Sequence, residues 1–189
     1  MELIKEVKQS KILRNVFVVL IGTVLLAISS KIKIPFYPVP MTMQTLVVLF
    51  LGITLGWKLG VATVALYLFE GIIGLPVFSG SPEKGIGIVY FTGPTMGYLI
   101  GFLFTAYFAG SFNYSKNLLG WKLFVKFLQL SFSVSFIYIF GILWLGVLIG
   151  WEKPLFQLGV QPFLLAELFK ILIILFSLSQ IKKLNKYIQ

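Results

Sequence analysis

Long apolar runs, separated by short stretches that contain glycine, proline or lysine, dominate this chain of 189 residues. A helix needs about 20 residues to cross the hydrocarbon layer of a bilayer, and six runs approach or reach that length. The runs lie near 13–31, 41–57, 59–76, 91–110, 123–149 and 163–181. Isolated strands cannot satisfy their backbone in lipid and no alternating barrel pattern occurs, so all six are predicted to be helices. We expect an all-α integral membrane protein, a bundle of six transmembrane helices in a single substrate-binding domain over 1–189.

The second and third runs are separated only by Trp57 and Lys58. Two helices joined by so short a link must lie antiparallel, so this pair is predicted to form a tight helical hairpin.

The composition supports a membrane environment and excludes several kinds of chemistry. Hydrophobic residues make up 58% of the chain and charged residues only 12%, too few to cover the surface of a soluble domain. The chain has no cysteine and no histidine, so disulfides, thiol nucleophiles, imidazole bases and the common zinc or haem ligands are excluded. The net charge is +10, but the basic residues do not form a patch with interleaved aromatics, which argues against nucleic-acid binding. No metal, cofactor or catalytic residue is predicted.

The basic residues predict the orientation of the protein in the membrane. Six spans place both termini on one side, and eleven basic residues then share that side while four lie in the opposite loops. The first set is Lys5, Lys8, Lys11, Arg14, Lys58, Lys116, Lys122, Lys126, Lys182, Lys183 and Lys186, and the second is Lys31, Lys33, Lys84 and Lys153. Because basic residues favour the cytoplasmic side, both termini are predicted to be cytoplasmic.

The two outer loops are unusually apolar. They read KIKIPFYPVP at 31–40 and GLPVFSGSPEKGIGIVY at 74–90. Irregular backbone near membrane depth is tolerated where it is buried in protein or lines a cavity, so we expect both loops to cover an outer pocket as a lid. The alternative is that they are merely hydrophobic surface loops.

The last apolar run contains an acid and a base, Glu167 and Lys170. Residues three apart share a helix face, so the two side chains can meet. A charge near the centre of a span costs about 2.5 to 3.5 kcal/mol, and pairing offsets much of that cost. The pair is either a structural ion pair or a polar anchor in an apolar ligand pocket, and we favour the anchor because intramembrane charges usually mark a substrate path.

Other polar side chains are candidates for the walls of such a pocket. Thr42 and Gln44 begin the second run just below the proline-rich loop, with Gln44 at about the depth of Glu167. Tyr90 and Tyr98 flank the start of the fourth run, where an apolar ring with a polar tip suits a ligand pocket. For Gln44 the alternative is exposure at the interface, and for the tyrosines it is a place in the aromatic belt of the membrane.

Four motifs together resemble the BioY family, the biotin-binding S components of energy-coupling-factor transporters. The motifs are IPFYPVPMTMQTL at 34–46, GLPVFSG at 74–80, GPTMGYLIGF at 93–102 and PFLLAELFK at 162–170. The resemblance covers nearly the whole chain. It implies a six-helix protein of a prokaryotic cell membrane that captures biotin from outside, with Val77, Phe78 and Ser79 among its candidate ligand-binding residues. It also implies a transmembrane coupling protein and two cytoplasmic ATPases as partners.

The chain departs from the family pattern at several positions. The acid of the last motif is usually aspartate and is Glu167 here, and Met96 replaces a glycine of the third motif. The family also has a small-residue face on the first helix that contacts the coupling protein. Here that face is Gly22, Thr23 and Ala27, and packing within the protein itself is the alternative role for these residues.

The chemistry of biotin suits a buried acid and base. We hypothesise that Glu167 accepts a hydrogen bond from a ureido N–H and that Lys170 donates to the ureido carbonyl, or alternatively to the carboxylate tail. An S component for another vitamin is the alternative within the same class. Two alternatives from other classes are a membrane enzyme and a purely structural subunit. This chain offers no nucleophile or metal cluster for an enzyme, and a structural subunit would leave the buried charges without a role. No Walker-type phosphate loop occurs, so concentrative uptake is expected to need the ATPase partners.

Overall fold

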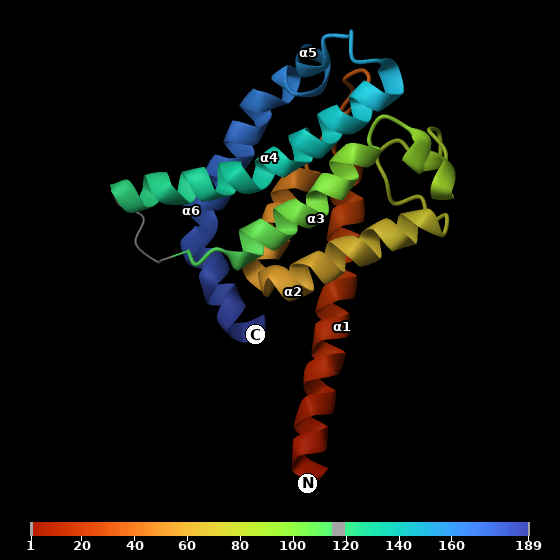
Figure 1. The fold of residues 1–189 in the computed structure, drawn as a ribbon. Coiled ribbons are helices and arrows are strands. Elements are labelled where there is room, and N and C mark those ends of the chain that lie inside the picture. Colours follow the sequence, from red (N-terminus) through yellow and green to blue (C-terminus); the bar gives the residue numbers. More distant parts are fainter. Residues whose placement is uncertain (1, 115–119, 189) are drawn as a thin grey trace.

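The protein is almost entirely helical, as the computed structural model shows (Figure 1). The model describes residues 2–114 and 120–188, and the side chains of residues 11–114, 120–178, 180 and 181. Its helices are α1 Glu2–Lys31, α2 Gln44–Ile72, α3 Met96–Ser111, α4 Trp121–Ile149, α5 Leu155–Gly159 and α6 Leu164–Ile188. The remaining elements are the strands β1 Lys33–Ile34 and β2 Met41–Thr42 and two 3-10 turns, Gly87–Thr92 and Gln161–Phe163. Each of the six predicted spans is therefore helical over most of its length.

The predicted hairpin between the second and third spans is confirmed within α2. Gly56 breaks the helix with φ 74° and ψ 170°, a conformation that glycine adopts without a steric cost. A Cβ added to Gly60 would lie 3.0 Å from the Cα of Gly52, whereas residues eight apart along a straight helix are separated by about 12 Å. The chain therefore turns back on itself at Gly56, and α2 consists of two arms packed side by side.

Two predicted boundaries and the purely helical fold need correction. The third span was predicted to run to residue 76, but α2 ends at Ile72, shortly before Gly74, which has φ +101°. The fourth was predicted from residue 91, but α3 begins at Met96, after Pro94. The first outer loop also contains the antiparallel β1–β2 pair, and α5 lies between the last two spans. Proline holds the residue before it in an extended conformation, which explains strand-like backbone beside the proline-rich turn.

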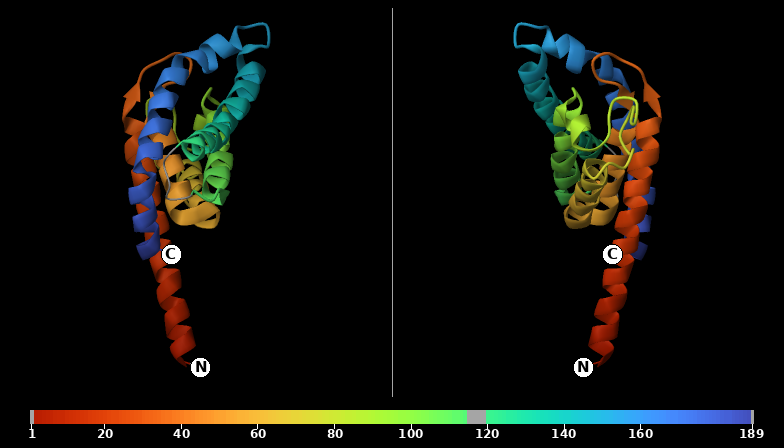
Figure 2. Two further views of the ribbon diagram at one scale, coloured as in Figure 1. Left: turned by 90° about the vertical axis from the view of Figure 1, so that its left-hand side faces the viewer. Right: turned by 90° about the vertical axis from the view of Figure 1, so that its right-hand side faces the viewer.

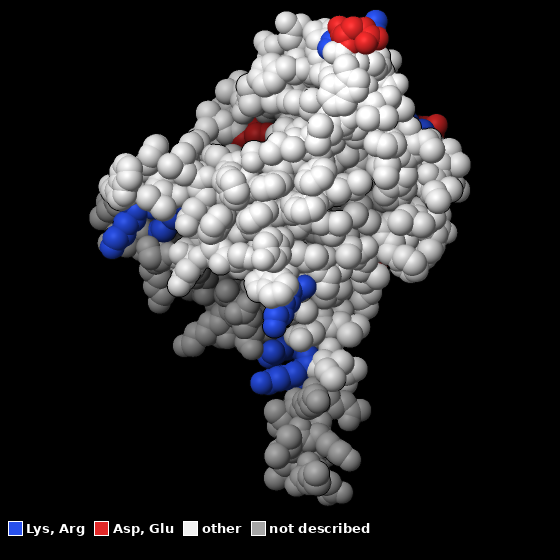
Figure 3. Space-filling model, viewed as in Figure 1, with Lys and Arg blue, Asp and Glu red and all other residues white. Residues whose placement is uncertain are grey.

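Four helices are long and apolar enough to cross a membrane, and the shorter α3 is apolar as well. This total counts the two arms of α2 as one helix and covers only the residues that the structure describes. The face shown in Figure 3 supports the same conclusion, because most of its surface is uncharged, with blue patches and no red ones in its lower half and the red patches in its upper half. The sequence, the helix lengths and this surface all indicate a multi-pass membrane protein.

Helix α3 lies between α2 and α4, and glycines allow the close packing. Gly97 and Gly101 lie four residues apart on α3 and face the backbone of α4 at Phe140 and Ile137. A side chain at either glycine would collide with that backbone, so this pair has the small-residue spacing that brings membrane helices together. Close packing is thus retained beside Met96, the position where the chain departs from the family motif.

Helix α1 stands at one side of the molecule, and its N-terminal half extends beyond the other helices (Figure 2). In the most apolar 18-residue stretch of α1, only 22% is buried inside the protein. Its contact with the rest of the bundle runs along α2, where Gly22 faces Thr63 and Leu51. Most of α1 therefore presents apolar side chains outward, as expected for a helix in lipid.

Candidate ligand-binding site

A pocket opens between the first outer loop and α2, α3, α4 and α6, beneath the second outer loop. It has a cavity volume of about 50 Å³. Its lining residues are Val39, Pro40, Met41, Thr42, Gln44, Thr45, Ser79, Tyr90, Thr95, Tyr98, Leu99, Phe102, Ile137, Tyr138, Phe163, Glu167 and Lys170. At about 10 to 15 Å³ per water this volume admits a few water molecules, so a larger guest requires the lining to move apart.

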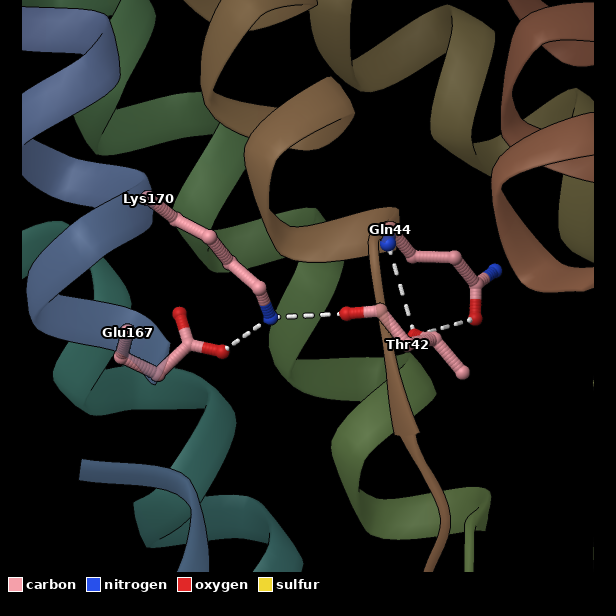
Figure 4. Close-up of polar contacts among 4 residues, drawn as sticks. All are labelled: Thr42, Gln44, Glu167 and Lys170. Atoms are coloured by element: carbon pink, nitrogen blue, oxygen red, sulfur yellow. Dashed lines mark hydrogen bonds and ion pairs between the residues drawn. The ribbon is translucent and has the colours of Figure 1, made fainter. Parts of the chain in front are cut away.

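Glu167 and Lys170 meet in this pocket, which confirms the predicted contact. Lys170 Nζ lies 2.7 Å from Glu167 Oε1 and also donates to the carbonyl oxygen of Thr42 at 2.7 Å (Figure 4). The two residues are 5% and 4% exposed. The ammonium thus ties α6 to β2 and, among the residues that the structure describes, uses two of its three N–H bonds, which leaves one for another acceptor.

Two oxygen atoms in the pocket are buried without a hydrogen-bond partner in the part of the chain that the structure describes. They are Oε2 of Glu167, whose carboxylate also lies near Tyr138, and Oγ of Ser79. Buried polar atoms are nearly always paired, because leaving one unpaired costs about 1 to 3 kcal/mol. Both residues line the pocket, so a polar guest there could complete their hydrogen bonding.

Gln44 is buried at 3% exposure, so the alternative of an exposed interfacial residue is wrong. Its side chain extends away from Lys170 (Figure 4). Gln44 Nε2 donates to the Tyr67 hydroxyl at 2.7 Å, and the hydroxyl of Thr42 donates to Gln44 Oε1 at 3.2 Å. Tyr67 in turn donates to the carbonyl oxygen of Val77 at 3.0 Å. Gln44 therefore connects the pocket to the second outer loop through the two arms of α2.

Tyr90 and Tyr98 both line the pocket, and their hydroxyl groups hold the backbone behind it. Tyr90 donates to the carbonyl oxygen of Ser79 at 2.8 Å, and Tyr98 donates to that of Gly159 at 2.9 Å. Burial raises the pKa of the Tyr90 phenol, so this group remains a neutral donor at physiological pH.

The other two candidates in the second loop lie outside the pocket lining. Phe78 is 1% exposed, stacks on Tyr90 with ring centroids 4.7 Å apart, and fills the space beside Gly71. Val77 is partly buried and packs against the same core. Of the motif GLPVFSG, the structure therefore brings only Ser79 to the pocket.

Several lining residues were not predicted from the sequence, chiefly Tyr138 and Phe163. Phe163 precedes Glu167 by four residues and Lys170 by seven, so helical spacing could have placed all three on one face. Tyr138 lies in the aromatic run SFIYIF, where every neighbour is equally suited to the core. No local signal distinguishes it, and only the packing of α4 beside α6 brings it near Glu167.

Gly22 and Thr23, predicted to contact a partner, are buried against α2 in this chain. Thr23 Oγ1 donates to the carbonyl oxygen of Leu20 at 3.0 Å. Ala27 is partly buried and packs against the core. These three small residues pack within the chain, and their contact with a coupling protein stays a prediction.

The model of the BioY family matches residues 4–187, almost the whole chain. This chain belongs to the BioY family. A probable biotin transporter BioY from Pyrococcus horikoshii is 33% identical over 157 residues, which cover 83% of this chain and 89% of the relative. The biotin transporter BioY of Thermotoga maritima is 33% identical over 165 residues, covering 87% and 94%.

The fold is also that of a solved transporter component. A crystal structure of the S-component for biotin from an ECF-type ABC transporter superposes with a TM-score of 0.73 at 26% identity, covering 92% of this chain and 93% of that one. Membership of the BioY family and the apolar helices identify a multi-pass protein of the prokaryotic cell membrane. In the described residues, no group of three or more His, Cys, Asp or Glu side chains could hold a metal ion.

Proposed function

We propose that this chain captures biotin as the S component of an energy-coupling-factor transporter. A separate transmembrane coupling protein and two cytoplasmic ATPases supply the energy for uptake, and the whole of residues 1–189 acts as one transmembrane substrate-binding domain. The observation that carries the proposal is the buried Oε2 of Glu167, unpaired among the described residues, beside the ammonium of Lys170 in a pocket with apolar walls. Family membership supplies the vitamin: curated relatives are named biotin transporters.

The geometry favours one of the two roles considered for Lys170. Glu167 Oε2 offers an acceptor, and the third N–H of Lys170 offers a donor close beside it. A ureido group presents an N–H and a carbonyl oxygen side by side, which complements this arrangement. The ion pair is neutral overall, so a carboxylate tail placed here would add an uncompensated buried charge at a large desolvation cost. Lys170 is therefore assigned to the ureido carbonyl and Glu167 to a ureido N–H.

The other lining residues complete a plausible binding surface. The hydroxyl of Ser79 is an additional polar contact, and Thr42 and Gln44 hold the strand that Lys170 contacts. Rings and aliphatic side chains from α3, α4, the two 3-10 turns and the first outer loop surround these groups, as in most small-molecule sites. The charge distribution supports a pocket on the extracellular side and both termini in the cytoplasm. In this assignment Lys5, Lys8, Lys116, Lys182, Lys183 and Lys186 lie outside the residues whose side chains the structure describes.

Equilibrium binding of biotin to the detergent-solubilised protein tests the proposal. Glu167→Gln and Lys170→Met are each expected to weaken binding at least about tenfold, because each removes a charge-assisted hydrogen bond. The matched controls are Glu152→Gln and Lys153→Met, an exposed acid and base, which should bind as the wild type does. Glu167→Asp, which keeps the charge, should retain binding and guards against loss through misfolding.

Comparison with the methyl ester of biotin distinguishes the two roles of Lys170. If Lys170 meets the ureido group, Lys170→Met lowers affinity for acid and ester by the same factor. If it meets the tail, the variant weakens the acid much more than the ester. The proposal fails if neither Glu167→Gln nor Lys170→Met reduces affinity, and the orientation fails if an impermeant thiol reagent cannot label Glu152→Cys from outside intact cells.

A further inference from the structure

The second outer loop is held by a lysine that the site described above does not include. Lys31 is the last residue of α1, and its Nζ lies among carbonyl oxygens of the segment 76–81. The distances are 2.7 Å to Pro76, 2.9 Å to Phe78 and 3.2 Å to Ser81, with the Ser81 hydroxyl oxygen at 3.4 Å. One ammonium group therefore gathers three backbone oxygens whose residues span six positions of the chain.

This segment has little regular structure of its own to satisfy those oxygens. Prolines at 76 and 82 remove backbone donors, and Gly80 adopts φ +79°. Buried or half-buried carbonyls without a ladder need donors from elsewhere, and a charged donor makes the stronger hydrogen bonds. The preceding residue of α1 contributes as well, with Ser30 Oγ 2.7 Å from the carbonyl oxygen of Val77.

One residue of the segment fixed in this way, Ser79, lines the pocket. Ser79 lies between the carbonyls of Phe78 and Ser81 that Lys31 holds, and its own hydroxyl is buried in the pocket without a partner among the described residues. Tyr90 donates to the Ser79 carbonyl and stacks on the Phe78 ring. A shift of segment 76–81 would therefore move both Ser79 and Tyr90 relative to a guest.

We propose that Lys31 is a positioning residue for ligand binding, which clamps segment 76–81 so that Ser79 and Tyr90 meet the ligand in a fixed place. Lys31 does not line the pocket itself, so it acts only through these residues. The inference rests on the proposed function for its ligand, biotin. Lys33 provides a natural contrast, because it is exposed and, in the described residues, makes no hydrogen bond to this segment.

The first experiment measures biotin affinity for Lys31→Met and, as the matched control, Lys33→Met. Lys31→Met is expected to bind biotin about tenfold more weakly, through a faster dissociation rate, as expected when a contact surface loses its preorganisation. Lys33→Met loses the same charge two residues away and should stay within about twofold of the wild type, as exposed charges usually do. Equal losses in both variants would show a general charge effect and overturn the proposal.

A double-mutant cycle with Ser79→Ala separates positioning from a general loss of stability. If Lys31 acts through the wall that Ser79 belongs to, Ser79→Ala should weaken biotin binding clearly in the wild type and hardly at all in Lys31→Met. If the two losses simply multiply, or if Lys31→Met lowers the melting temperature while its folded fraction binds biotin normally, Lys31 is only structural. Lys31→Gln, which keeps an N–H donor without the charge, replaces Lys31→Met should that variant fail to fold.

A measurement without ligand keeps this test independent of the proposed function. Amide hydrogen exchange at residues 79–81 should be faster in Lys31→Met than in Lys33→Met or the wild type, because the clamp holds these amides closed. Failure of the wild type to bind biotin contradicts the proposed function alone. Unchanged exchange in Lys31→Met contradicts the clamp, whatever the ligand is.

Discussion

The two loops beside the pocket are alike in composition and different in anchoring. The first, between α1 and α2, is held by the short β1–β2 ladder, by the hydrogen bond from Met43 N–H to the Ile32 carbonyl at 3.1 Å, and by that from Lys170 Nζ to the Thr42 carbonyl at 2.7 Å. Its tip is open to the surroundings, with Tyr37 91% exposed. The second loop buries Phe78 at 1% exposure, and side chains of α1, α2 and the 3-10 turn hold its carbonyl oxygens.

Glycine and proline content alone therefore does not determine how firmly a loop is anchored. The first loop receives a side-chain donor from α6, whereas the second receives side-chain donors from α1, α2 and the 3-10 turn. Local opening costs more where such contacts are many and buried. Because the pocket of about 50 Å³ must widen for a vitamin-sized guest, we expect the first loop to move and the second to stay in place.

The largest expected effect is on stability, when an aromatic anchor is removed from each loop. Phe78→Ala should lower the free energy of unfolding by about 3 to 5 kcal/mol, the usual cost of emptying a buried aromatic site. Phe36→Ala, in the first loop, should cost much less, because Phe36 is 39% exposed and touches the Phe163 ring edge-on at 6.0 Å. Thermal unfolding of the two purified variants in detergent gives the comparison.

Similar melting temperatures for the two variants would remove the distinction between the loops. A larger loss in Phe36→Ala than in Phe78→Ala would reverse it and make the first loop the fixed one. Phe78→Leu, which restores most of the buried volume, should recover part of the stability if the effect is one of packing.

A smaller effect is expected on the rate of binding when each loop is tethered. The chain has no natural cysteine, so a pair can be introduced cleanly. The pair Ile34→Cys and Phe169→Cys puts one cysteine on the first loop and the other on α6. Both positions line the same groove. Joining them with a short thiol-reactive linker should slow biotin association at least about tenfold if that loop must open, because binding that requires a conformational change has a low association rate.

The matched tether joins Ser30→Cys to Val77→Cys in the second loop, where the native side chain and carbonyl already meet at 2.7 Å. That link should change the association rate by less than about twofold, since rigidifying a segment that does not move leaves the bound conformation equally accessible. Each unlinked cysteine pair is the reference for its own link. Slowing by the second tether and not the first would contradict the assignment of mobility.

The sequence predicted the elements whose evidence is local. Apolar runs of bilayer length identified the helices, and the two-residue link at Trp57 and Lys58 identified the hairpin in α2. The spacing of Glu167 and Lys170 on one helix face predicted a contact that the structure shows at 2.7 Å. In each case the deciding residues are close in sequence, so no knowledge of helix packing was needed.

What the sequence did not predict depends on contacts between distant segments. The two outer loops read alike, and only the fold shows that Lys31 and Ser30 lie against the second and not the first. Tyr138 becomes a lining residue because α4 packs near α6, and Phe78 turns into the core because Gly71 leaves room for its ring. Only the fold likewise shows that Gly22 of α1 packs against Thr63 and Leu51 of α2.

The smallest expected effect concerns the hydroxyl group that connects the pocket to the second loop. Tyr67 is fully buried, accepts from Gln44 and donates to the Val77 carbonyl, so Tyr67→Phe removes two hydrogen bonds while keeping the ring. The expected loss in the free energy of unfolding is about 1 kcal/mol, because the Gln44 amide is left without an acceptor while Val77 keeps its contact with Ser30. Thermal unfolding measures this change, and Tyr37→Phe, which alters an exposed hydroxyl of the first loop, is the control. A loss as large as that of Phe78→Ala would mean that this hydroxyl, and not the buried ring, is what fixes the second loop; no loss at all would mean that the clamp from α1 is sufficient without it.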